Sequence, residues 1–220
     1  MRVSPEDLII SPEKIQIQKN IFLITGNDLS LIEKIKMVLV SILNKSNFLE
    51  VEINENQKIN HKIFLNNQAS LLSDKKIIIH KNPKEIDTDC FENIKDGEEA
   101  IIIIDTKIKN SSKIKQYFEK SKNLISITCY TLTDEKRRRI IDNAFSSNNI
   151  KIQKDGYWYF IDNSDEQYLM LENEIKKIIS YGKKEISLNE VRLLLSGNFN
   201  KKIDDLFFLI LSSQYEIIKK

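Results

Sequence analysis

Four consecutive isoleucines, Ile101 to Ile104, stand between Glu99-Ala100 and Asp105. A short, β-branched and wholly apolar run with polar residues at both ends predicts a strand that is buried on both faces. Strands of this kind occur in parallel sheets, because helices cover both faces of such a sheet. We therefore expect an α/β fold in which 99–106 is an inner strand.

Shorter apolar or alternating runs recur through the first half of the chain. They predict strands at 21–26, 48–53, 75–81, 99–106 and 124–131. Helical spacing of apolar residues predicts intervening helices at 27–45, 57–72, 86–95 and 111–122. Either Asn27 or Asp28 can cap the first of these helices. The alternation of strand and helix predicts a parallel sheet flanked by helices.

After Tyr130 the pattern is helical only. Helices are predicted at 132–149 with Thr133 as N-cap, at 164–182 with Gly182 as its stop, at 187–196, and at 202–220. Ser187 and Glu190 have the spacing of a capping box. An α/β domain over 1–131 is thus expected to precede a small helical domain over 132–197.

Composition limits the classes of protein that the chain can belong to. Its net charge of +2 gives no strong field toward nucleic acid or anionic lipid. Cys90 and Cys129 have no CxxC spacing, which predicts unpaired thiols and a cytoplasmic protein. There is no signal-peptide pattern and no run near the roughly 18 apolar residues that span a bilayer, so no membrane partner is expected.

The loop after the first predicted strand lacks the residues of a phosphate-binding loop. Such a loop needs G-x-x-x-x-G-K-[ST], so that backbone amides and a lysine surround the phosphates. Here only Gly26 is present. We therefore expect neither ATP binding nor any other bound cofactor.

Few residues have the spacing of a catalytic or metal site. His61 and His80 are far apart, and each is expected at the surface or at an edge. Asp105 ends the strongest strand, where α/β proteins often place a magnesium-binding acid. Without a phosphate loop, a cap or turn role for Asp105 is favoured over magnesium binding. Residues 104–107 also resemble the D-x-K pattern of a nuclease, but no second acid can be placed beside it, so no catalytic or metal-binding residue is assigned.

The basic cluster is Lys136, Arg137, Arg138 and Arg139. Consecutive helical residues point all round a helix, so a solvated helix face is the simpler interpretation. A contact with a DNA phosphate backbone is the alternative.

The order of these segments resembles the delta subunit of bacterial DNA polymerase III, a clamp-loader subunit. The similar segments are IFLITGNDLSLIEKI, ASLLSDKKIIIHKNPKEI, IIIIDTKIKNSSKIKQYFEK, TCYTLTDEKRRRIIDNAF, LENEIKKIISYGKKEISLNEVRLLLS and NKKIDDLFFLILSS. The resemblance implies a degenerate AAA+ (P-loop NTPase-like) domain that does not bind ATP, followed by a small helical lid-like domain. Residues 198–220 would begin a helical collar domain, most of which this chain lacks.

The same resemblance implies a function in DNA replication. The chain would be a non-catalytic subunit of a DNA-directed DNA polymerase (nucleotidyltransferase) holoenzyme that binds the sliding clamp (beta) and opens it for loading onto primed DNA. Its other partners would be the clamp-loader subunits gamma/tau and delta prime. Two alternatives remain: an α/β nucleotide-dependent enzyme, either ATPase or nuclease, and a general nucleic-acid-binding module.

Leu71 and Leu72 follow Ser70 at the end of the helix predicted at 57–72. From the pattern alone, a leucine pair is expected in the core. The resemblance instead places Ser70, Leu71 and Leu72 at the clamp-binding tip of the first domain. There Lys75 and Lys76 would form a polar rim.

Overall fold

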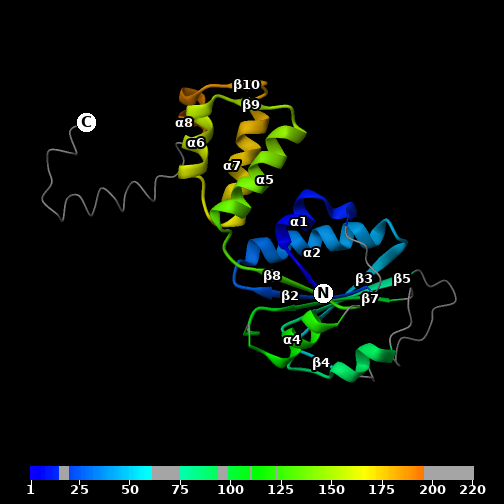
Figure 1. Ribbon diagram of the computed structural model, residues 1–220. Coiled ribbons are helices and arrows are strands. Elements are labelled where there is room, and N and C mark those ends of the chain that lie inside the picture. Colours follow the sequence, from blue (N-terminus) through cyan, green and yellow to red (C-terminus); the bar gives the residue numbers. More distant parts are fainter. Residues whose placement is uncertain (15–19, 61–74, 94–98, 110, 122, 196–220) are drawn as a thin grey trace, which may run out of the picture. The chain divides into compact units, whose positions relative to one another are not determined.

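The computed structural model describes residues 1–14, 20–60, 75–93, 99–109, 111–121 and 123–195 (Figure 1). The chain divides into two compact units. The first comprises Met1–Lys136 with Gln167–Leu169, and the second comprises Arg137–Glu166 with the chain from Met170 onward. None of the described helices is both long and apolar enough to cross a membrane.

A parallel sheet of six strands forms the centre of the first unit. Its strands are β1 (Arg2–Val3), β2 (Ile21–Gly26), β3 (Phe48–Glu55), β5 (Lys75–Lys81), β7 (Glu99–Asp105) and β8 (Ile125–Cys129), in the order β1-β8-β2-β7-β5-β3. All five pairings are parallel. The α/β fold with a parallel sheet is therefore confirmed, and the four isoleucines lie in an inner strand, β7.

Helices cover both faces of the sheet. Parallel crossovers are right-handed, so connections that run in opposite directions across the sheet lie on opposite faces. Figure 1 shows α1 (Pro5–Ile10) and α2 (Leu29–Asn44) on one face and α4 (Lys113–Lys120) on the other. The 3₁₀ helix η2 (Thr88–Asn93) packs on the α4 face, where the Phe91 and Phe118 rings meet edge to face with centroids 5.5 Å apart.

Alternation along the inner strands divides the core between these faces. One buried cluster takes Ile21, Leu23, Ile101 and Ile103 together with Phe91, Phe118 and Leu124. Because side chains alternate along a strand, the remaining apolar residues of β2 and β7 point to the α2 face. There the buried stripe of α2 consists of Leu31, Ile32, Ile35, Leu39 and Leu43.

The second unit is mainly helical. Its elements are α5 (Asp134–Ser147), β9 (Lys151–Ile152), α6 (Lys154–Asn163), α7 (Tyr168–Ser180), β10 (Glu185–Ile186) and α8 (Leu188–Leu195), of which α5 and α7 begin in the first unit. Helix α6 approaches α8 closely, because a Cβ on Gly156 would lie 3.2 Å from the Leu188 backbone. At the start of α8, Glu190 Oε2 accepts from the Ser187 backbone N–H at 2.9 Å and from Ser187 Oγ at 2.8 Å, which confirms the capping box.

Several predicted elements differ from the structure. The helix predicted from residue 57 is wrong at its start, where Lys58–Ile59 forms strand β4 and pairs with β6 (Glu85–Ile86). The α-helix predicted at 86–95 is instead this strand followed by η2. Helix α6 and the N-terminal β1 and α1 were not predicted. For α1, Pro5 to Ile10 spans too few residues for a periodic pattern to emerge.

Candidate functional site

The loop that joins β2 to α2 lies at the carboxyl edge of the sheet, where open α/β sheets bind their ligands. Gly26 ends β2 with φ +138°, in a region of backbone space that favours glycine. A Cβ at this position would overlap the carbonyl group of Cys129 at the end of β8. Glycine at position 26 therefore allows β2 and β8 to lie in close contact.

The amides of this loop are used inside the protein. Asn27 N and Asp28 N both donate to the Cys129 carbonyl oxygen, at 3.1 and 3.2 Å. A phosphate-binding loop instead turns successive amides toward its ligand. The first two backbone N–H groups of the β2–α2 loop therefore point into the sheet.

Asp28 also closes the N-terminus of α2. Its Oδ1 accepts from Leu31 N at 2.9 Å and from Ser30 Oγ at 2.6 Å, which confirms Asp28 as the N-cap. A helix N-terminus attracts anions, but here a carboxylate of the chain itself takes that position. A phosphate would meet both a negative charge and amides that are already bonded, so this loop is poorly suited to a nucleotide.

Asp105 lies at the same edge of the sheet, at the end of β7. It is 7% exposed, and its Oδ1 accepts from Lys107 N at 2.8 Å. This is the turn role favoured from the sequence. Among the described residues, no three acidic, histidine or cysteine side chains are grouped so that they could hold a metal ion.

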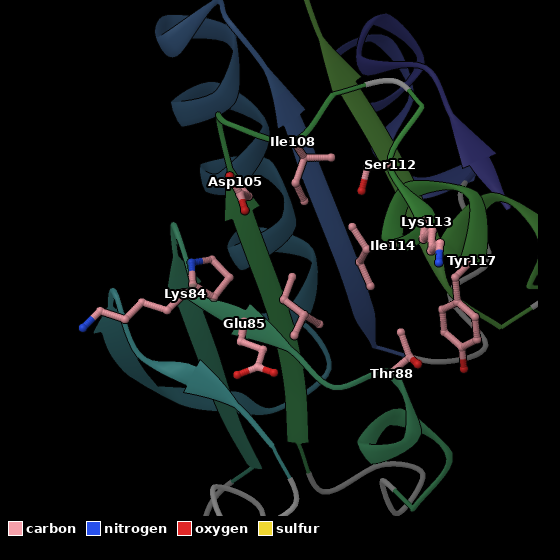
Figure 2. Close-up of a pocket in the computed structure, with 11 residues that line it drawn as sticks. Lys84, Glu85, Thr88, Asp105, Ile108, Ser112, Lys113, Ile114 and Tyr117 are labelled. Atoms are coloured by element: carbon pink, nitrogen blue, oxygen red, sulfur yellow. The ribbon is translucent and has the colours of Figure 1, made fainter.

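A pocket of about 470 Å³ opens beside Asp105 (Figure 2). It is lined by Pro83, Lys84, Glu85, Ile86, Thr88, Asp105, Ile108, Ser112, Lys113, Ile114 and Tyr117. Figure 2 shows Asp105 and Ile108 on one side and Ile114 and Tyr117 of α4 on the other. Glu85 is paired with Lys58 at 2.6 Å. The other acid of the lining, Asp105, accepts from Lys107 N, so both carboxylates of the lining are bonded to groups of the chain itself.

Cys90 and Cys129 are free thiols, as predicted, and both are buried. Burial raises the pKa of each to about 12. Thiols with such pKa values remain protonated at neutral pH and are poor nucleophiles.

The sequence-based expectation for His80 is wrong. The side chain is 1% exposed, because β5 lies between β3 and β7. Neither imidazole nitrogen has a hydrogen-bond partner, and burial lowers the pKa of this histidine. His61 lies outside the described residues.

The structure places the four cations of the basic cluster in different surroundings on α5. Arg137 is buried and donates through Nη1 to the Ser164 carbonyl oxygen at 2.7 Å. Lys136 Nζ is paired with Glu6 at 3.2 Å, and the Arg138 guanidinium lies 5.0 Å from the centroid of the Trp158 ring. Arg139 is exposed. The four side chains therefore do not form one continuous basic stripe.

Ser70, Leu71 and Leu72 lie outside the described residues, so the clamp-binding tip stays a prediction. The strand that follows is described from Lys75, whose Nζ lies 5.2 Å from the centroid of the Phe48 ring.

The sequence matches no protein-family model, and no curated protein matches it at a significant level. Solved structures do match. The Bacillus subtilis DNA clamp loader delta protein aligns with a TM-score of 0.61 and 13% sequence identity over 86% of this chain. The alignment covers 62% of that protein, so the chain spans about three-fifths of its length.

Two further structures align less closely. Domain III of the Thermotoga maritima replication initiation protein DnaA aligns with a TM-score of 0.41 and 15% identity, over 87% of this chain and 89% of that domain. The Thermotoga maritima RuvB branch migration motor aligns with a TM-score of 0.43 and 10% identity, over 87% of this chain and 66% of the motor. Over most of its length, the chain has the fold of the Bacillus subtilis DNA clamp loader delta protein.

Proposed function

We propose that the chain is a non-catalytic clamp-loader subunit that binds the sliding clamp and opens it for loading onto primed DNA. The observation that carries the proposal is the similarity in fold to a clamp loader delta protein over 86% of the chain. The order of the sequence segments supports the same function independently.

The β2–α2 loop supports a subunit that does not hydrolyse ATP. Two of its amides bond to Cys129, and Asp28 caps the helix where a phosphate would bind. An AAA+ domain with this loop can serve as a protein-binding part, while the neighbouring gamma/tau subunits of the assembly supply ATP hydrolysis. Contacts with gamma/tau and delta prime, and with primed DNA, belong to the same proposal.

Clamp binding is assigned to Leu71 and Leu72, with Ser70 before them. Two leucines that enter an apolar pocket contribute on the order of 3 kcal/mol or more, which is typical of the dominant contacts in a protein interface. For DNA, the placement of the basic cluster favours exposed Arg139 over buried Arg137 as a backbone contact.

Binding of the chain to the sliding clamp of the same organism tests the proposal. The double variant Leu71→Ala, Leu72→Ala should weaken binding by about a hundredfold or more in surface plasmon resonance. Its thermal midpoint should stay close to that of the unmodified chain. The matched control is Leu193→Ala, which changes a leucine that is 67% exposed in the second unit.

Three results would contradict the proposal or a part of it. Wild-type protein that does not bind the clamp removes the function itself. A double variant that loses several kcal/mol of stability shows instead that the leucine pair belongs to the core. Tight ATP binding by the isolated chain would favour the enzyme alternative.

A further inference from the structure

An open apolar groove of about 630 Å³ lies between α2 and β3 in the first unit. The described residues that line it are Lys36, Met37, Val40, Ser41, Asn44, Lys45, Val51, Ile53 and Ile79. This groove is separate from the pocket in Figure 2, which is lined by α4 and the loops after β5 and β7.

One wall of the groove is a second stripe of α2. Met37, Val40, Ser41 and Asn44 follow the spacing i, i+3, i+4, i+7, so they share one side of the helix. The core-facing residues of α2 form a different stripe, of which Leu39 is fully buried. Met37 lies on the stripe that faces away from the core and is 61% exposed.

The floor of the groove is the outer part of the sheet. Val51 and Ile53 alternate along β3 on one face and are 44% and 52% exposed, and Ile79 of β5 lies beside them. Among the described residues, β3 pairs only with β5, so it is an edge strand. Exposed β-branched residues on an edge strand invite unwanted pairing, and proteins usually replace them with charges. Their presence here indicates a surface that another molecule covers.

The charges around the groove select the kind of molecule. Its described lining contains two lysines and no carboxylate. Lys36 is paired with Glu33 on the same helix, whereas Lys45 is exposed. Lys36 lies on α2 and Lys45 is its C-cap nine residues later, which is a rise of roughly 13.5 Å along the helix axis at 1.5 Å per residue. A second copy of this chain would bring the same lysines together across a concave surface, which disfavours a dimer through the groove.

We propose that this groove binds an amphipathic helix of another protein, with apolar residues on one side and carboxylates at the ends of that side. The apolar residues pack against Met37, Val51 and Ile53, beside α2. The carboxylates approach Lys36 and Lys45. Helix-in-groove recognition of this type places its apolar residues at the spacing i, i+3/i+4, i+7.

Two fluorescent peptides test the proposal on the full chain. Each is a helical peptide of about fourteen residues with leucines on one side, long enough to form a helix on binding. One has glutamates at both ends of that side, and the other has lysines there. The acidic peptide should bind about tenfold more tightly or better in fluorescence anisotropy.

Variants then locate the bound peptide. Ile53→Glu should weaken binding of the acidic peptide by about tenfold or more. The control Leu29→Glu, which changes another exposed residue of α2 outside the groove lining, should leave binding unchanged. The double variant Lys36→Glu, Lys45→Glu should reverse the preference toward the lysine peptide. Circular dichroism checks that each variant is folded.

Several results would overturn the proposal. Equal binding of both peptides would show that the groove binds their leucines but that Lys36 and Lys45 do not select for acidic residues. Binding that survives Ile53→Glu would place the peptide elsewhere. A dimer that Ile53→Glu converts to monomer would assign the groove to a second copy, and binding to anionic vesicles with no peptide binding would assign it to a membrane.

Discussion

Strands β7 and β3 belong to one parallel sheet but have opposite surroundings. Ala100 to Ile103 of β7 are each 0% exposed, whereas Ile53 of β3 is 52% exposed. Strand β7 lies between β2 and β5, while β3 occupies the edge. The difference separates residues that hold the fold together from residues that lie exposed at the edge, although both strands contain β-branched side chains.

The largest expected effect lies at the end of an inner strand. Gly26→Ala should destabilise the first unit by about 4 kcal/mol, because the new methyl group overlaps the Cys129 carbonyl and the residue must keep φ +138°. Urea unfolding followed by circular dichroism measures the loss.

Gly182→Ala is the matched control for this prediction. Gly182 also has a positive φ, +79°, but a Cβ there meets no atom within 4 Å. Gly182→Ala should lower the free energy of unfolding by about 1 kcal/mol, because alanine must adopt the positive φ but its Cβ meets no other atom. Equal losses at the two glycines would show that the contact between β2 and β8 contributes nothing.

The second prediction compares the two strands directly. Ile102→Ala removes a fully buried side chain and should cost about 3 kcal/mol, because it leaves a cavity. Ile53→Ala removes a half-exposed side chain and should cost less than about 1 kcal/mol. Chemical denaturation of both variants under the same conditions tests this ratio, and similar losses would mean that the edge of the sheet is part of the core.

The isoleucine run of β7 shows which features could be predicted from sequence. Ile101 to Ile104 are buried on both faces, and a continuous apolar run has few other interpretations. The Ser187–Glu190 box and an N-cap at Asn27 or Asp28 were also predictable, because such contacts are local in sequence, and the structure selects Asp28. The absence of a phosphate-loop motif predicts that the chain does not bind ATP, and this stays a prediction.

Features that depend on distant residues were harder to predict. The direction of the Asn27 and Asp28 amides is set by Cys129, about a hundred residues later in the chain. His80 was expected at the surface or at an edge, yet β5 has a neighbouring strand on each side. The groove beside α2 needs both the second helical stripe and the edge position of β3, and periodicity alone does not reveal strand order.

The smallest expected effect concerns His80, on the strand between β7 and the edge. Burial lowers its pKa below the usual 6.5, so in acid the unfolded chain binds a proton that the native chain does not. Stability should therefore fall as the pH decreases through 6.5, by at most about 1.4 kcal/mol per pH unit from this residue. His80→Leu should remove this part of the loss, since leucine does not titrate and leaves no unpaired nitrogen.

The measurement is the difference in unfolding free energy between pH 7.5 and pH 5.5 for wild type and variant, with His61→Gln as the control for the other histidine. If wild type and His80→Leu lose the same stability over this range, His80 binds protons equally in the native and unfolded chain, and burial in β5 does not lower its pKa.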